Sequence, residues 1–190
     1  MVNNFFSDQS FRHQNYKETS LIKGEYMNCT FQHCNFENVH VSNIQFVECE
    51  FIDCNFSNAI VNDTAFREVV FRHCKMIGVP FHTCDPFLLK LSFEKCTIHL
   101  SSFYQVNLTN TIFKNCSLDE ADFTEANLKG SELINCTLRA TVFDRTNLEN
   151  VDLSTSEQFE IDPEQNRVKG AKFSQENVAG LLVKHKIIVV

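Results

Sequence analysis

Apolar side chains recur along this chain at every fifth position. From Phe6 to Phe81, and again from Phe93 to Leu153, each fifth residue is apolar or aromatic. The two runs hold 16 and 13 such positions without an exception, although apolar residues make up only 43% of the chain. A period of five fits neither the 3.6-residue period of an α-helix nor the two-residue alternation of a plain strand.

The residue two places before each central apolar residue is smaller, mostly Cys, Ala, Ser, Thr or Val. This pattern arises when two alternating side chains point inward and a tight turn then redirects the chain. Such a chain coils around its own core, and each coil hydrogen-bonds to the next at about 4.8 Å. The pattern therefore predicts an all-β solenoid, a β-helix.

The nine cysteines indicate the number of sides in each coil. Several of them lie 20 residues apart, as Cys34 and Cys54 do, and four sides of five residues make a coil of that length. With a two-residue insertion within 82–92, one inward ladder is expected from Cys34, Cys54, Cys74, Cys96, Cys116 and Cys136. We interpret these residues as small apolar fillers of the core, and not as metal ligands or a redox pair.

Charge is spread unevenly along the chain. Residues 94–164 carry 13 acidic and 5 basic side chains, so the negative charge of the chain, −7 in total, is concentrated in this segment. An acidic body disfavours direct binding to nucleic acid, but it suits a basic protein surface, including one that normally holds DNA. With no apolar run long enough for a membrane span and no secretory signal, we expect a cytoplasmic protein with reduced thiols.

The repeat is interrupted at residues 82–92, "HTCDPFLLKLS". We expect Leu88 to fill the skipped inward position and Phe87 or Leu89 to be exposed. An apolar bulge on an acidic rod suits a protein partner, so the candidate contact residues are Pro86, Phe87, Leu88 and Leu89. The alternative is a tolerated insertion without a function.

The C-terminal segment 174–190 departs from the repeat that spans residues 1–173. Ser174 is suited to cap a short helix, and an apolar strand is expected from Ile187 to Val190. A solenoid ends in an open edge that a helix can cover and a terminal strand can pair across a two-fold axis. We expect a homodimer through Val178, Leu181, Leu182, Ile187, Ile188 and Val189; a cap within one chain is the alternative.

We find no enzyme-like constellation and expect no catalysis, cofactor or metal. A convex rod offers paired carboxylates no pocket that would exclude water. The column His13, His33, Asp53 and His73 is interpreted as a solvated corner, because ligands in a straight line cannot surround Zn²⁺. The column Asn107, Asn127 and Asn147 is interpreted as a structural amide ladder.

The segment "EADFTEANLKGSEL", residues 120–133, resembles the pentapeptide-repeat family, with its small residue two places before a Phe or Leu centre. The resemblance implies a right-handed quadrilateral β-helix. The tail "EIDPEQNRVKGAKFSQENVAGLLVKHKIIVV" is similar to that of the quinolone-resistance and toxin-immunity members, which bind DNA gyrase and topoisomerase IV. In that subfamily the tail closes the coil and forms a dimer, and loops that break the coil contribute to protection.

This resemblance implies an acidic protein that mimics DNA, binds gyrase or topoisomerase IV, and protects it from fluoroquinolones or related poisons. The expected acidic contact face consists of Asp119, Glu120, Asp122, Glu125, Glu132, Asp144, Glu149 and Asp152. The alternatives are a non-catalytic scaffold for an unrelated protein partner and an immunity factor against a co-encoded toxin.

Overall fold

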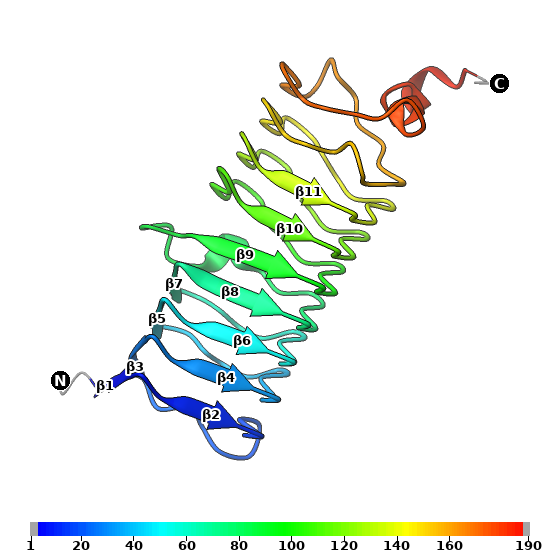
Figure 1. The fold of residues 1–190 in the computed structure, drawn as a ribbon. Helices are drawn as coiled ribbons and strands as arrows, with labels where there is room; N and C mark the ends of the chain where they lie inside the picture. Colours follow the sequence, from blue (N-terminus) through cyan, green and yellow to red (C-terminus); the bar gives the residue numbers. More distant parts are fainter. Residues whose placement is uncertain (1–3, 188–190) are drawn as a thin grey trace.

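The computed structural model describes residues 4–187 and shows an all-β solenoid of parallel strands, with the N-terminus at one end and the C-terminus at the other (Figure 1). The first side of the coil carries β1 (Asn4–Ser7), β3 (Gly24–Met27), β5 (Gln45–Val47) and β7 (Ala65–Arg67). The second side carries β2 (Ser10–Arg12), β4 (Thr30–Gln32), β6 (Glu50–Ile52), β8 (Val69–Arg72), β9 (Leu91–Glu94), β10 (Ile112–Lys114) and β11 (Glu132–Ile134).

The other two sides carry single parallel bridges instead of strands. Asn35 bridges Asn15 and Asn55 on the third side, and further bridges such as His40 to Ile60 define the fourth. We number the sides 1 to 4 in chain order. On side 2, residue 31 pairs with residue 51, whereas residue 71 pairs with residue 93 across the insertion. These registers confirm a coil of twenty residues with four sides, and an insertion of two residues.

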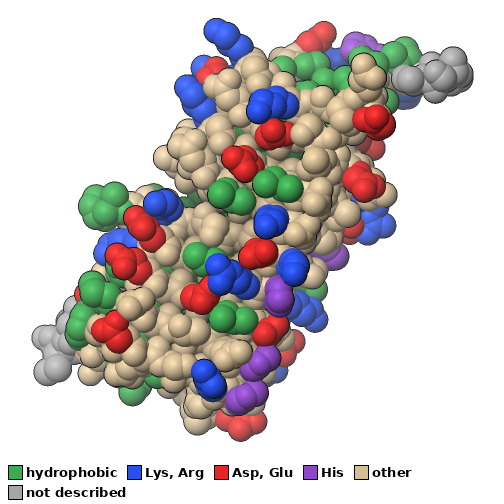
Figure 2. Space-filling model, in the orientation of Figure 1, with side chains coloured by type: hydrophobic (Ala, Val, Ile, Leu, Met, Phe, Trp, Pro, Cys, Tyr) green, Lys and Arg blue, Asp and Glu red, His purple; other side chains and the backbone are tan. Residues whose placement is uncertain are grey.

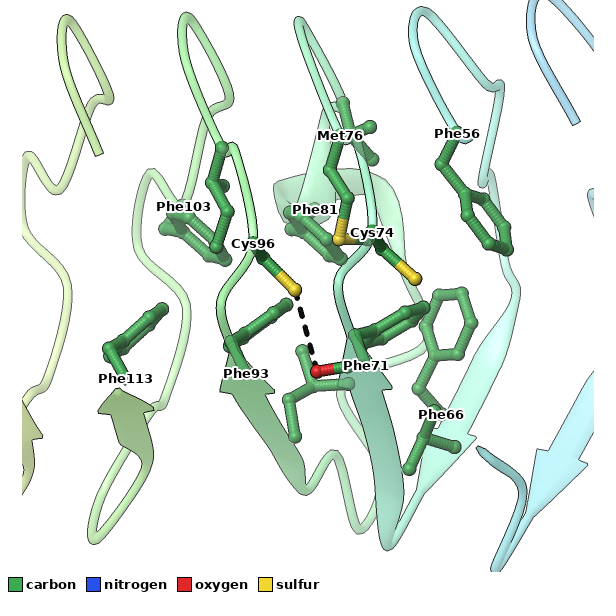
Figure 3. Packing of buried hydrophobic residues seen from close by; sticks show 14 of the residues in the cluster. Phe56, Phe66, Phe71, Cys74, Met76, Phe81, Phe93, Cys96, Phe103 and Phe113 are labelled. Atoms are coloured by element: carbon green, nitrogen blue, oxygen red, sulfur yellow. Dashed lines mark hydrogen bonds between the residues drawn. The ribbon is translucent and has the colours of Figure 1, made fainter. Parts of the chain in front are cut away.

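The central side chain of each side fills the interior. Ring centroids of Phe31 and Phe51 lie 4.8 Å apart in a stacked pair, and those of Phe71 and Phe93 lie 5.5 Å apart across the insertion. Figure 3 shows Phe71 and Phe93 stacked in consecutive coils, with Phe113 continuing the column. Each buried Phe contributes roughly 1.5–3 kcal/mol by burial alone, so these columns are the main stabilising feature of the rod.

All nine cysteines are free and buried. The thiol of Cys96 donates to the carbonyl of Phe71 in the coil before it, at 3.4 Å (Figure 3). Serine does the same at the equivalent position, where the Ser131 hydroxyl donates to the Leu108 carbonyl at 2.7 Å. Burial raises the pKa of Cys49 to about 12, so this thiol stays protonated at neutral pH. The cysteines therefore occupy the position of a small inward filler.

A left-handed residue turns the chain at most corners of the coil. The backbone φ is 58° at Asn110, 59° at Glu120 and 55° at Ala140, and similar values recur two residues after most centres. Gly, Asn, Asp and His tolerate this conformation best, and they occupy many of these corners. At Gly130 a Cβ would lie 2.5 Å from the Asn110 Oδ1 of the preceding coil, so glycine also relieves crowding there.

The insertion differs from the sequence-based expectation in one respect. Leu88 does not fill the skipped inward position: its side chain is 65% exposed, and its φ of 56° is that of a corner residue. Leu89 packs against the core in its place, partly buried. The reason is backbone pairing, because Lys90 N–H donates to the Phe66 carbonyl at 3.0 Å and so fixes Leu89 beside the core.

The C-terminal segment is also not the regular helix that was predicted. It contains two short 3₁₀-helices, η2 (Val178–Leu181) and η3 (Val183–His185). A third, η1 (Phe81–Thr83), lies at the start of the interrupted segment 82–92. Asn177 holds the segment on the last coil, because its side-chain amide donates to the carbonyls of Leu153 and Ser156 at 2.9 and 2.8 Å. Gly180 also approaches Phe159 so closely that a Cβ there would clash with its carbonyl oxygen, so the segment packs tightly on the last coil.

Part of the predicted terminal strand lies outside the described residues. Ile187 belongs to no strand, and Ile188, Val189 and Val190 are not described. Among residues 4–187, no helix has the length and apolar character needed to cross a membrane.

Candidate functional site: an acidic side and an apolar bulge

The eight acidic residues proposed as one contact face lie on all four sides of the coil. Glu132 and Asp152 are register neighbours on side 2, and Glu149 follows the Asn147 bridge on side 1. Asp119 lies on side 3. The remaining four belong to side 4 or its corners: Glu120, Asp122, Glu125 and Asp144. The eight residues therefore do not form a single face, because outward positions one repeat apart point in different directions.

Basic neighbours neutralise several of these carboxylates. Asp119 pairs with Arg139 at 3.2 Å, Glu149 with Arg167 at 3.0 Å, and Asp152 with Lys172 at 3.4 Å. Arg145 contacts both Glu125 and Asp144, at 2.9 and 3.2 Å. Within residues 4–187, Glu120, Asp122 and Glu132 have no ion-pair partner. Two of these three unpaired carboxylates, Glu120 and Asp122, belong to side 4.

On side 2, acidic and basic side chains of successive coils neutralise one another. Arg72 pairs with Glu50 in the coil before it and with Glu94 in the coil after it, and Lys114 lies 3.8 Å from Glu94. Figure 2, which views the molecule from this side, shows acidic and basic side chains close to one another along the rod. A surface with alternating signs does not attract a highly charged partner over a distance.

Side 4 is the most acidic side in the C-terminal half of the solenoid. The segment 158–166 lies between the Glu157 bridge on side 3 and the Arg167 bridge on side 1, and so continues side 4. We define the side 4 acidic face as Glu120, Asp122, Glu125, Asp144, Glu160, Asp162 and Glu164. Its ion-pair partners within residues 4–187 are Arg145 and Lys184, the latter bound to Asp162 at 2.9 Å and to Glu164 at 2.6 Å.

Two of these carboxylates, Glu125 and Asp162, have a lowered pKa and so favour the charged form. A hydrogen bond from Gln105, together with Arg145, lowers the pKa of Glu125 below its ordinary value. A hydrogen bond from Lys184 lowers the pKa of Asp162. Sequence reasoning missed Glu160, Asp162 and Glu164 because the five-residue period ends at Leu153, so no register assigned them to a side.

The insertion forms an apolar bulge on side 1. Phe87 and Leu88 are 63% and 65% exposed. The Arg67 guanidinium lies 5.5 Å from the centroid of the Phe87 ring and 3.6 Å from the Asp85 carboxylate, and it donates to Gln45 at 3.1 Å. These contacts anchor the bulge to β7, so its apolar tip is presented in a defined position.

A groove of about 770 Å³ lies beside the bulge, where sides 1 and 2 meet. Its apolar lining includes Val47, Val70, Leu88, Leu89, Leu91 and Ile112. Figure 2 shows the hydrophobic protrusion at the left edge of the molecule, with charged side chains around it. Of the four predicted loop residues, Leu88 and Leu89 line this groove, Phe87 packs on Arg67, and Pro86 is exposed.

The histidine column lies on an open corner. The His13 and His33 rings stack at 4.9 Å, and Asp53 lies 3.8 Å from His33 and 3.4 Å from His73. Within residues 4–187, no three His, Cys, Asp or Glu side chains are grouped so that they could hold a metal ion. The asparagine column is a hydrogen-bonded ladder, in which Asn127 donates to Asn107 at 3.1 Å and Asn147 to Asn127 at 3.0 Å.

The C-terminal segment exposes part of its predicted dimerisation set. Val178 and Ile187 are 42% and 55% exposed, whereas Leu181 and Leu182 are half-buried. Val183, which was not among the predicted residues, is 44% exposed beside them. Ile188 and Val189 lie outside the described residues.

Comparisons with known proteins identify the repeat. A family model described as a pentapeptide repeat region matches residues 24–91 and residues 88–162. The full-length structure of QnrB1, described as a plasmid-mediated fluoroquinolone resistance protein, is 19% identical, covers 97% of this chain and 100% of its own, and has a TM-score of 0.56. A trypsin-treated variant of QnrB1 is 18% identical over 97% of this chain and 99% of its own, with a TM-score of 0.64. Comparison with curated proteins finds no match.

Proposed function

The chain belongs to the pentapeptide repeat family, and from this premise we propose that it binds DNA gyrase or topoisomerase IV as a mimic of DNA. In this proposal the bound protein protects the enzyme from fluoroquinolones or related poisons. The observation that carries the proposal is the side 4 acidic face, whose seven carboxylates form ion pairs, within residues 4–187, with only two basic side chains, Arg145 and Lys184.

The physical basis of the proposal is electrostatic complementarity. Successive coils place charged residues at steps of about 4.8 Å along a rod, which gives a basic DNA-binding surface a row of anions to engage. Glu120 and Asp122 are the central members because no basic side chain within residues 4–187 neutralises them. Binding of this kind should weaken as the salt concentration rises, since exposed charges are screened.

The bulge supplies a second contact in this proposal. It replaces side 1 of one coil, directly after the side 4 centre Phe81, so the bulge and side 4 are neighbouring sides of the rod. Phe87 and Leu88 would give the partner an apolar anchor that salt does not screen. The C-terminal segment would join two chains through Val178, Val183 and Ile187, which would double the number of acidic faces.

The test is DNA supercoiling by gyrase and decatenation by topoisomerase IV, with and without a fluoroquinolone, at increasing concentrations of the protein. We expect the wild type to restore activity in the presence of the drug. The double variant Glu120→Gln/Asp122→Asn should need about tenfold more protein, because two surface charges contribute roughly 1–1.5 kcal/mol together.

The matched control is Glu132→Gln/Asp152→Asn, which removes two register neighbours from side 2. This control should protect as well as the wild type. If micromolar protein changes neither enzyme's activity nor its drug sensitivity, the proposal is wrong, and a scaffold for an unrelated partner is favoured. Protection against a peptide toxin but not against a fluoroquinolone would indicate the immunity role.

A further inference from the structure

Three exposed apolar side chains border the unpaired carboxylates on side 4. Ser102, Asp122 and Val142 are in direct register in three consecutive coils. Leu100 and Tyr104 lie two residues before and after Ser102, so both are in the coil next to Glu120 and Asp122. The exposed fractions are 58% for Leu100, 39% for Tyr104 and 45% for Val142. A row of acids therefore lies between two rows that carry apolar side chains.

The fold does not require apolar residues at these positions. The interior of these coils is filled by the side 4 centres Phe103, Phe123 and Phe143. Most other coils carry a polar residue at the place of Tyr104, as Ser42, Asn62 and Thr124 show, although the first coil has Ile22 there. Tyr104 and Val142 point outward and add nothing to the packed core.

Leu100 is in addition unfavourable for the backbone. Its φ is 57°, in the left-handed region that a branched aliphatic residue rarely adopts. The equivalent corners in earlier coils are Asn38, Asn58 and Gly78, which tolerate that conformation. A strained leucine that is more than half exposed contributes little to the stability of the folded chain, which suggests that it serves in binding and not in folding.

We propose that Leu100, Tyr104 and Val142, with Asp122 and Glu120, form a contact site that prefers arginine over lysine on a protein partner. One Asp122 oxygen accepts the Thr124 N–H at 2.9 Å, which leaves the other oxygen for a guanidinium. A guanidinium bound there lies beside the Tyr104 ring, on whose face it stacks, while its aliphatic stem covers Val142 or Leu100. A lysine ammonium is a more strongly hydrated point charge and gains less from this surface.

This inference deepens the proposed function, since the partner would be an arginine-bearing surface of the topoisomerase, but its first test does not depend on that enzyme. We would measure binding of the full chain to an arginine-rich peptide and to a lysine-rich peptide of equal length and charge. The wild type should bind the arginine peptide at least fivefold more tightly. The preference should disappear in Tyr104→Ser and persist in Ile22→Thr, a control for an exposed apolar residue at the place of Tyr104 in the first coil.

The second measurement is the dependence of gyrase binding on salt. Tyr104→Ser should weaken binding at every salt concentration and leave the slope of log Kd against log salt unchanged, whereas Asp122→Asn should reduce that slope. Equal affinity of the wild type for the two peptides, or wild-type behaviour of Tyr104→Ser, would overturn the inference. An arginine preference without any binding to gyrase or topoisomerase IV would contradict the proposed function and leave the arginine site standing.

Discussion

At the scale of single residues, the left-handed corner decides where each side ends. Ala140 occupies such a corner with a φ of 55° and an exposed side chain. Its Cβ is strained there by about 1 kcal/mol and has no core contact to compensate. Ala121 is the opposite case, because it is a fully buried inward residue without a positive φ. The same residue type is therefore unfavourable at one position of the repeat and favourable at another.

Ala140→Gly should raise the free energy of unfolding by about 0.5–1 kcal/mol, since glycine adopts positive φ without strain. Ala121→Gly should lower it by about 1 kcal/mol or more, because a buried methyl group and backbone rigidity are both lost. Urea unfolding followed by circular dichroism measures both values. A loss of stability in Ala140→Gly would show that the corner is not strained.

At the scale of elements, the C-terminal segment closes the coil and still exposes apolar surface. Asn177 ties it to the last coil by two hydrogen bonds, while Lys184 forms an ion pair with Asp162. Val178 and Val183 are 42% and 44% exposed. Neighbouring exposed apolar side chains of this kind mark a surface for another protein, and a second copy of the chain is the partner expected here.

The variant Val178→Ser/Val183→Ser should convert a dimer into a monomer, and light scattering after gel filtration should show half the mass. Stability of the single chain should change little, because neither side chain is buried. Ile22→Ser is the matched control, since Ile22 is 55% exposed at the opposite end of the rod, and its mass should equal that of the wild type. A wild-type monomer would contradict dimerisation through this segment.

At the scale of the whole molecule, each coil packs only on the coils before and after it, so a residue's contribution depends on its position along the rod. Phe71 is fully buried between stacked partners in both directions, Phe51 at 5.1 Å and Phe93 at 5.5 Å. Phe11 belongs to the first coil, is half-buried, and stacks in one direction only, on Phe31 at 4.7 Å. The middle of the rod is therefore more sensitive to substitution than its N-terminal end.

Phe71→Ala should lower the free energy of unfolding by about 3–5 kcal/mol, the usual value for a large cavity in a packed core. Phe11→Ala should cost less than half of that, because its ring loses fewer contacts. Urea unfolding of the two variants under one set of conditions makes the comparison. Equal losses at both positions would mean that the first coil is as well packed as the middle.

The sequence by itself determined the solenoid, its four sides and the inward ladders. The reason is that the five-residue repeat is local. Most sides have a large central residue, a small residue two places before it, and a turn after it. Even the insertion was placed correctly, because the cysteines keep their register on both sides of it. The repeat does not predict how the segments outside it pack, namely the insertion and the C-terminal segment. Because Lys90 pairs with the backbone of Phe66, Leu89 and not Leu88 lies beside the core. The C-terminal segment forms short 3₁₀-helices in which Asn177 and Gly180 contact the last coil.

Only the tertiary structure decided which outward charges act together. Most outward positions hold different polar residues from one coil to the next, since solvent accepts any of them, and their sides follow from the register of the coils. Glu120 and Asp122 thereby share side 4 with Leu100 and Tyr104, while Glu132 lies on another side altogether. Pairing with Arg139 or Arg167 from the next coil then neutralises Asp119 and Glu149. The composition of the core follows from the five-residue spacing of the sequence, whereas the charge of the outer surface depends on side chains about twenty residues away, in the next coil.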